Sequence, residues 1–259
     1  MVPILEVYDA SSSCDRHVGT ARFSLRRGAV STTFEYSTAW LTNTPNSYAI
    51  DPSLPLMPGF QHASGIPTAF RDSSPDRWGR TLIERDYRER QHQKGEISHQ
   101  LDDVDFLLGV FDQTREGSLR FREPDGSFLA ESPIIPPLLQ LPQLLHASRE
   151  VALHEAGHQE VKELLAAGSG SLGGARPKAS ICADKKLLIA KFSHPGDEWD
   201  VMAWEKTMLD LAAQAGIPVP VSQLIRIGNE SVLLLERFDR DDSRIDGLAT
   251  SCTSSCTTS

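Results

Sequence analysis

The sequence has few of the features that mark secreted, disulfide-bonded or membrane proteins. Only four of its 259 residues are cysteine, at positions 14, 182, 252 and 256, and their spacing suggests no paired framework. No apolar run approaches the roughly 20 residues that a membrane-spanning helix needs. The N-terminus also lacks a basic segment followed by an apolar core, so no secretory signal is expected. These absences favour a protein of the reducing cytoplasm, with no membrane partner.

The sequence also contains fewer basic than acidic residues. Lysine and arginine number 26 against 35 aspartates and glutamates, a formal net charge of −9 at pH 7. This balance argues against a broad electrostatic grip on nucleic acid, so direct nucleic-acid binding is not expected. The hydrophobic share of 39% is ordinary for a globular protein, and the length is sufficient for two domains.

The first half of the chain predicts a small antiparallel sheet with accompanying helices. Alternating apolar residues indicate short strands, while residues 42–69 are rich in Pro, Asn, Ser and Gly and predict an irregular excursion. Apolar positions at helical spacing then indicate two helices. The expected strands are 4–8, 19–25, 33–36 and 118–121, and the expected helices are 76–90 and 102–111. Prolines between 133 and 142 mark the expected domain boundary.

The second half predicts helices around a second small sheet. Helical spacing indicates a helix over 158–167 and a longer one over 199–216, which ends at a glycine. Two short strands, 179–183 and 187–190, flank a polar turn. A hairpin about Gly228-Asn229 is expected to join two more strands, 221–227 and 231–236. The predicted fold class is therefore α+β.

A glycine-rich segment carries the most informative chemistry. Gly168, Gly170 and Gly173 fit the pattern G-x-G-x-x-G, and glycines let backbone N–H groups approach phosphate oxygens. Lys191 follows on an apolar strand and can neutralise phosphates, while Glu205 on the next helix can hold that lysine in place. Strands after the glycines are typical of a kinase nucleotide lobe, not of a dinucleotide-binding fold. An ordinary hairpin with a glycine-rich entry is the alternative.

A second motif points to different chemistry. His154-Glu155-Ala156-Gly157-His158 matches H-E-x-x-H, in which two histidines on one helix face share a zinc ion and the glutamate activates water. A zinc metallopeptidase is thus an alternative function. The motif lacks a suitable third ligand, and Gly157 weakens a helix by about 1 kcal/mol, so no metal site is expected.

The chain as a whole to about residue 245 resembles the HipA family of bacterial toxin kinases. Five separated segments carry the resemblance: 51–56, 75–80, 117–121, 171–179 and 235–240. Segment 75–80 looks like the family's Pro-Asp-x-Trp-Gly-Arg element, segment 171–179 like its glycine-rich loop, and segment 235–240 like its hinge.

This resemblance implies a HipA-like serine/threonine kinase fold that uses ATP and Mg²⁺. Family members are toxins neutralised by a HipB-like DNA-binding antitoxin, and characterised ones phosphorylate a protein substrate, an aminoacyl-tRNA synthetase. Lys191 would correspond to the ATP-phosphate lysine, supported by Glu205, and Ser171, with Ser169, to the autophosphorylated position. The implied ATP-binding residues are Gly168, Gly170, Ser171, Gly173, Gly174, Lys178, Lys191, Glu236 and Phe238.

The resemblance also has a limit. In this family the catalytic aspartate and the Mg²⁺-binding residues lie well after the hinge, and Asp239, Asp241 and Asp242 do not replace them. The expectation is therefore an N-terminal subdomain over 1–135, an incomplete nucleotide-binding lobe over 136–245, and no catalytic C-lobe. Residues 246–259 have almost no core-forming side chains and predict a disordered, out-of-frame tail. Such a chain would have no catalytic residues and would be inactive alone, and a non-catalytic binding module for an antitoxin or partner kinase subunit is the remaining alternative.

Overall fold

The chain folds as two compact units, each built around its own antiparallel sheet. In a computed structural model, the described residues are 3–11, 14–26, 28–42, 47–124, 126–129, 135–184 and 186–239. The first unit comprises Met1–Pro75 and His99–Glu131, and the second comprises Asp76–Ser98 and Ser132–Ser259. The mixed α and β class agrees with the expectation. The expected domains ran continuously along the chain, whereas the second unit takes in the segment Asp76–Ser98.

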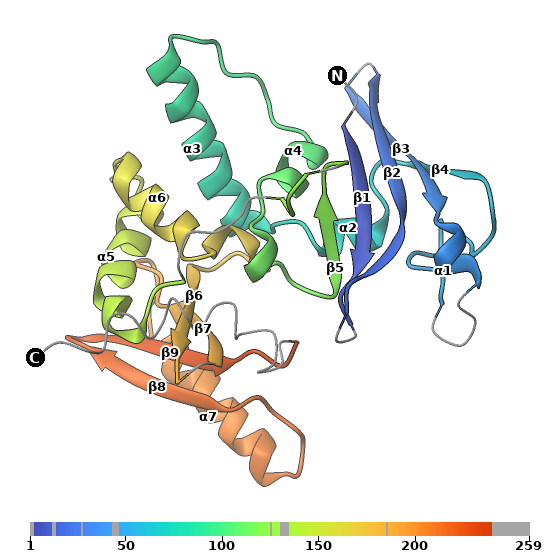
Figure 1. Cartoon of the computed structure of the whole chain (residues 1–259). Helices are drawn as coiled ribbons and strands as arrows, with labels where there is room; N and C mark the ends of the chain where they lie inside the picture. Colours follow the sequence, from blue (N-terminus) through green and yellow to red (C-terminus); the bar gives the residue numbers. More distant parts are fainter. Residues whose placement is uncertain are drawn as a thin grey trace, which may run out of the picture. The chain divides into compact units, whose positions relative to one another are not determined.

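The first unit contains a five-stranded antiparallel sheet in the order β4-β3-β2-β1-β5 (Figure 1). Its strands are β1 (Ile4–Asp9), β2 (Arg16–Arg26), β3 (Ala29–Tyr36), β4 (Phe60–Ser64) and β5 (Leu119–Arg122). The strands expected from alternation are confirmed. The expectation that 42–69 is irregular throughout is wrong, because Phe60–Ser64 pairs with β3 and forms the edge of the sheet.

Short helices cover the apolar face of this sheet. They are α1 (Thr38–Thr42), α2 (Thr68–Asp72), α4 (Asp103–Leu108) and the 3-10 turn η1 (Asp112–Thr114). Phe70 of α2 makes edge-to-face contacts with Phe23, Phe34 and Phe121 of the sheet, at centroid separations of 6.4, 6.1 and 5.2 Å. These contacts place α2 at the centre of the first core.

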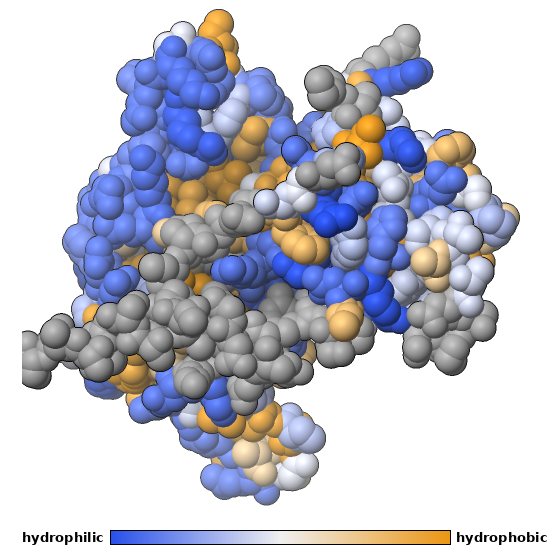
Figure 2. Space-filling model, in the orientation of Figure 1, coloured by the Kyte–Doolittle hydropathy of each residue, from blue (hydrophilic) through white to orange (hydrophobic). Residues whose placement is uncertain are grey.

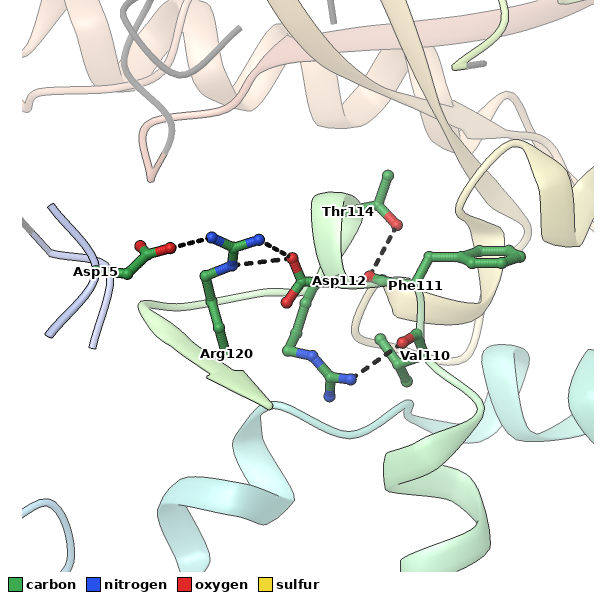
Figure 3. Close-up of polar contacts among 7 residues, drawn as sticks. Asp15, Val110, Phe111, Asp112, Thr114 and Arg120 are labelled. Carbon is green, nitrogen blue, oxygen red and sulfur yellow. Dashed lines mark hydrogen bonds and ion pairs between the residues drawn. The ribbon is translucent and has the colours of Figure 1, made fainter. Parts of the chain in front are cut away.

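A polar network joins η1 to the sheet (Figure 3). Arg120 of β5 donates to Asp112 Oδ2 through Nε at 2.9 Å and through Nη2 at 2.5 Å, and it also pairs with Asp15. Burial alone would lower the pKa of Arg120, but the hydrogen bonds and negative charges of Asp112 and Asp15 together outweigh it and raise the pKa. The network therefore holds a guanidinium charge firmly between two carboxylates.

The second unit contains a four-stranded antiparallel sheet in the order β6-β7-β9-β8. Its strands are β6 (Lys178–Ala183), β7 (Lys186–Phe192), β8 (Ser222–Ile227) and β9 (Glu230–Glu236). The predicted strand pair and the predicted hairpin about Gly228-Asn229 are both confirmed, with a residue or two of difference at their ends. Both patterns are local, which is why the sequence is sufficient to predict them.

Helices cover both faces of this second sheet. On one face, α3 (Arg77–Lys94), α5 (Leu141–Ala152) and α6 (His158–Ala166) form a core with alternate residues of β6, β7 and β9. On the other face lies α7 (Val201–Gln214), whose Met202 packs against Leu233 and Leu235 of β9. The predicted helices over 158–167 and 199–216 are confirmed as α6 and α7.

The outer surface of α7 is partly apolar. Trp204, Met208 and Leu211 recur at helical spacing and are 61%, 60% and 52% exposed. Figure 2 shows hydrophobic surface mixed with hydrophilic surface at the lower end of the view, where Figure 1 places α7. Within the part of the chain that the structure describes, each helix is too short or too polar to cross a membrane.

Candidate functional site

An ion pair links the second sheet to α7. Lys191 of β7 places Nζ 2.5 Å from Oε1 of Glu205, and the two side chains are 28% and 33% exposed. Glu205 is held in position because α7 packs on this face of the sheet. Asp200 is the N-cap of α7, and its carboxylate accepts a hydrogen bond from Ala203 N–H at 2.9 Å. The helix carboxylate predicted to hold Lys191 does contact it.

A second lysine lies beside the first. Lys178 of β6 is directly opposite Lys191 in the β6–β7 register. Directly opposite residues of an antiparallel pair project from the same face of a sheet, so both ammonium groups belong to the face that α7 covers. Lys178 is only 7% exposed, and its Nζ donates to the carbonyl oxygen of Gly173. Because two ammonium groups, those of Lys178 and Lys191, lie with one carboxylate, that of Glu205, the net charge of these three groups at this corner of the sheet is positive and suits an anion.

The first half of the glycine motif forms a packed helix end. Gly168 adopts the left-handed conformation (φ 65°) after α6, and Ser169–Ser171 form the 3-10 turn η3. A Cβ on Gly170 would lie 3.0 Å from Leu165 Cδ2, so the glycine permits close packing with α6. This part of the segment therefore packs as a turn and does not form an open loop.

Both candidate serines belong to this packed turn. Ser169 and Ser171 are 0% and 3% exposed, and Ser169 Oγ donates to the carbonyl oxygen of Lys178. Neither serine is therefore exposed, although both were predicted as the autophosphorylated position. The reason is tertiary, because η3 packs against α3 and α6.

The second half of the motif is a loop held at both ends. Gly174 N–H donates to Oδ2 of Asp76 at 2.6 Å, and Gly174 C=O accepts from Trp78 N–H at 3.3 Å. Beyond the glycines, Arg176 Nη1 lies 2.7 Å from Asp197 Oδ2. That hydrogen bond raises the pKa of Arg176 and lowers the pKa of Asp197. Gly173 and Gly174 thus lie next to Lys178, whereas Gly168 and Gly170 serve packing.

The predicted hinge residues lie at the end of β9. The Glu236 carboxylate accepts hydrogen bonds from Lys186 Nζ at 2.9 and 3.0 Å. The backbone N–H of Glu236 donates to the carbonyl oxygen of Val221. Phe238 follows with its side chain 94% exposed. The contact of Lys186 with Glu236 could not be predicted, because a lysine in a polar turn carries no signal for a partner fifty residues away.

The H-E-x-x-H motif does not lie on one helix. His154 follows the end of α5 with φ 63°, and α6 begins only at His158. His158 Nε2 lies 3.0 Å from Asp86 Oδ1, and its Nδ1 lies 3.1 Å from Gln93 Nε2. The helix face that a shared zinc ion requires is therefore not formed. Within the described residues, no cluster of three or more His, Cys, Asp or Glu side chains could hold a metal.

A hollow of about 380 Å³ lies near the N-terminal end of α7. Its lining includes Trp199, one guanidinium (Arg149) and four carboxylates (Asp197, Glu198, Asp200 and Glu230), so the charge of the hollow is negative on balance. Negative charge repels phosphate, and neither Lys178 nor Lys191 faces this hollow. The hollow is therefore separate from the candidate anion site.

Two family models match the chain. The HipA N-terminal domain matches residues 13–121, and the HipA-like C-terminal domain matches residues 170–258. Together they span more than half of the sequence, with similarity in each of the two compact units. The chain belongs to the HipA family. The second match runs into the segment 246–259, which composition predicts to be an out-of-frame tail and which lies outside the described residues.

A solved structure is also similar over most of the chain. It is the HipA, HipB and operator DNA complex of a Shewanella oneidensis MR-1 toxin–antitoxin system, with 17% sequence identity and a TM-score of 0.47. The similarity covers 92% of this chain and 51% of that one. The chain thus spans about half the length of that relative. A comparison with curated proteins found no match.

Proposed function

We propose that this chain provides the ATP-binding lobe of a HipA-type serine/threonine protein kinase of a toxin–antitoxin system. The observation that carries the proposal is the ion pair between Lys191 on a central strand and Glu205 on the helix that covers it. A lysine held in this way is the recurring phosphate-binding device of protein kinases. Membership of the HipA family supports the same assignment.

Each residue of the site has a role in this proposal. Lys191 and Lys178 neutralise the phosphates, and Glu205 fixes Lys191. N–H groups of the 173–176 loop other than that of Gly174, which donates to Asp76, approach the phosphate oxygens. The adenine contacts the segment from Glu236 to Phe238. Bound ATP supplies the phosphoryl group that a kinase transfers. The described residues do not form a cluster that fits Mg²⁺, so no step through this ion is assigned to them.

The proposal extends to regulation and partners. A phosphate on Ser171 adds nearly two negative charges, which repel the phosphates of ATP. Because Ser171 is 3% exposed, its autophosphorylation requires the η3 turn to open first. Family membership points to a HipB-like DNA-binding antitoxin as the partner and to a protein as the substrate.

Calorimetric titration of the purified chain with ATP tests the proposal. We expect the wild type to bind ATP and the Lys191→Met variant to bind at least about ten-fold more weakly, since hydrogen bonds to charged groups are worth about 1.5–3 kcal/mol. Lys206→Met is the matched control, because Lys206 lies on α7 and pairs with Asp210 at the surface. A wild type that binds no ATP, or equal affinities for the wild type and Lys191→Met, would overturn the proposal.

A further inference from the structure

The N-terminal residue of α3 makes an unusual contact. Asp76 is the N-cap of α3, but its side chain makes no capping hydrogen bond to that helix. An aspartate in this position normally accepts from an N–H of the first helical turn. Asp76 Oδ2 instead accepts from Gly174 N–H at 2.6 Å, across 98 residues of sequence. The carboxylate is thus directed at the glycine-rich loop and not at its own helix.

The same segment also binds the other backbone group of Gly174. Trp78 N–H donates to Gly174 C=O at 3.3 Å, and the Trp78 side chain is 5% exposed within the core beneath the sheet. The contacts of Asp76 and Trp78 with Gly174, which we call the tether, are therefore anchored in the packed core through Trp78. Gly174 has φ 95°, a conformation that glycine adopts readily and other residues do not.

The tethered position is the one that touches Lys178. A Cβ at Gly174 would lie 2.6 Å from Lys178 Nζ, and the carbonyl oxygen of the preceding Gly173 accepts a hydrogen bond from that same Nζ. Fixing Gly174 consequently fixes the surroundings of the Lys178 ammonium group. The second tether, between Arg176 and Asp197, is more exposed, with the Arg176 side chain at 43%.

A carboxylate on a loop N–H group can have one of two effects. It can set the conformation of the loop, or it can occupy a donor that a phosphate needs. A carboxylate that only competed with phosphate would need to contact no group of Gly174 other than its N–H. The segment 76–78 holds the N–H and the C=O together, and contacts to both groups constrain the backbone dihedrals between them. This arrangement favours the first effect.

We propose that Asp76 is a positioning residue of the glycine-rich loop, which holds Gly174 beside Lys178 and so preorganises the loop for the phosphates of a nucleotide. The part that concerns nucleotides rests on the proposed function. The proposal also gives a physical role to the aspartate of the Pro75-Asp76-Arg77-Trp78-Gly79-Arg80 element.

Two substitutions of the full chain test the proposal. Asp76→Ala removes the acceptor, whereas Asp76→Asn keeps an oxygen that can accept from Gly174 N–H. In amide hydrogen exchange without nucleotide, we expect the amides of residues 172–176 to exchange at least about ten-fold faster in Asp76→Ala and nearly as in the wild type in Asp76→Asn. In ATP titration we expect about three- to ten-fold weaker binding for Asp76→Ala and recovery in Asp76→Asn. Asp210→Ala, at the surface of α7, is the control and changes neither measurement.

The outcomes separate this proposal from the proposed function. Unchanged exchange of the loop in Asp76→Ala overturns the tether. Tighter ATP binding by both variants overturns it in favour of a carboxylate that competes with phosphate. Because exchange is measured without nucleotide, it decides the tether even if the wild type binds no ATP, a result that overturns the proposed function alone.

Discussion

Lys191 and Glu205 form an ion pair that joins the sheet to α7, with 2.5 Å between Nζ and Oε1. About a third or less of each side chain is exposed, so water screens the pair and its contribution to folding is small. Its importance is positional, since it fixes the place of one positive charge on the face that also carries Lys178.

Replacing Glu205 by glutamine separates the contribution of the ion pair to stability from its effect on the position of Lys191. We expect Glu205→Gln to lower the free energy of unfolding by less than about 1 kcal/mol and to weaken ATP binding by about two- to ten-fold, because Lys191 is no longer fixed. Urea unfolding and calorimetric titration measure the two quantities. In the double variant with Lys191→Met, the glutamine should cause no further loss of affinity. A Glu205→Gln variant with wild-type affinity would contradict this account.

Alanine substitutions at two glycines distinguish backbone strain from a direct clash. Gly174 and Gly216 both have positive φ, 95° and 79°, but only the Cβ at Gly174 would meet a neighbour, Lys178 Nζ. We expect both Gly→Ala variants to lose about 1 kcal/mol or more of stability from the strained backbone. Only Gly174→Ala should also weaken ATP binding, because Lys178 must move. Equal effects of both substitutions on affinity would show that the loop does not position Lys178.

Asp51 makes the stability of the first unit sensitive to acid. Its Oδ1 accepts from Ser53 N–H at 2.8 Å, and its Oδ2 accepts from Ala69 N–H at 2.9 Å, in the first turn of α2. Burial alone would raise the pKa of Asp51, but the hydrogen bond from Ser53 Oγ at 2.6 Å and the backbone hydrogen bonds together outweigh it and lower the pKa below its ordinary value of 3.8. The stability that Asp51 contributes is therefore fully present above pH 3.8 and is lost as the pH falls through the lower folded value.

The substitution Asp51→Asn tests whether this carboxylate makes the stability depend on pH. We expect Asp51→Asn to lower the free energy of unfolding at pH 7 by about 1–3 kcal/mol and to flatten the decline of that free energy as the pH falls below 3.8. Urea unfolding at several pH values measures both effects. Asp72→Asn, an exposed substitution at the end of α2, is the control and should keep the wild-type profile. Parallel profiles for the wild type and Asp51→Asn would refute the assignment.

Arg115 holds together the ends of two helices in the first unit. Arg115 is only 1% exposed. Its guanidinium donates to the carbonyl oxygens of Ser73 at 2.8 Å, Leu107 at 3.1 Å and Val110 at 3.0 Å. Burial lowers the pKa of Arg115 to about 10, so the group stays charged at neutral pH. These three oxygens follow α2 and lie at the end of α4, where helices leave carbonyls without partners.

Removing this guanidinium should be costly. We expect Arg115→Met to lower the free energy of unfolding by about 3–5 kcal/mol, because buried carbonyl oxygens lose their donor. Arg115→Lys should recover part of that loss, since an ammonium group lacks the fork that reaches all three oxygens. Arg71→Met, at an exposed position of α2, is the control and should change stability little. A small effect of Arg115→Met in urea unfolding would exclude this role.

Local patterns account for most of the secondary structure. Alternation with a period of two residues is sufficient for β1, β2 and β3, and Trp78, Leu82 and Ile83 recur at helical spacing in α3. The hairpin of β8 and β9 follows from the turn at Gly228-Asn229. Lys191 on a strand and Glu205 on the next helix were also predictable, because a helix that follows a strand packs back on the same sheet. Each of these inferences depends on neighbours within a few residues or on one connection.

Tertiary contacts decided the features that the sequence did not reveal. The strand Phe60–Ser64 exists because β3 offers an edge to pair with, despite the surrounding prolines and glycines. The turn Ser169–Ser171 is buried because α3 and α6 close over it, and His154 and His158 are separated by a break between α5 and α6. The hydrogen bond from Gly174 to Asp76 joins residues 98 positions apart. Such contacts depend on which surfaces meet when the whole chain packs, and a periodic pattern records only which side of an element is apolar.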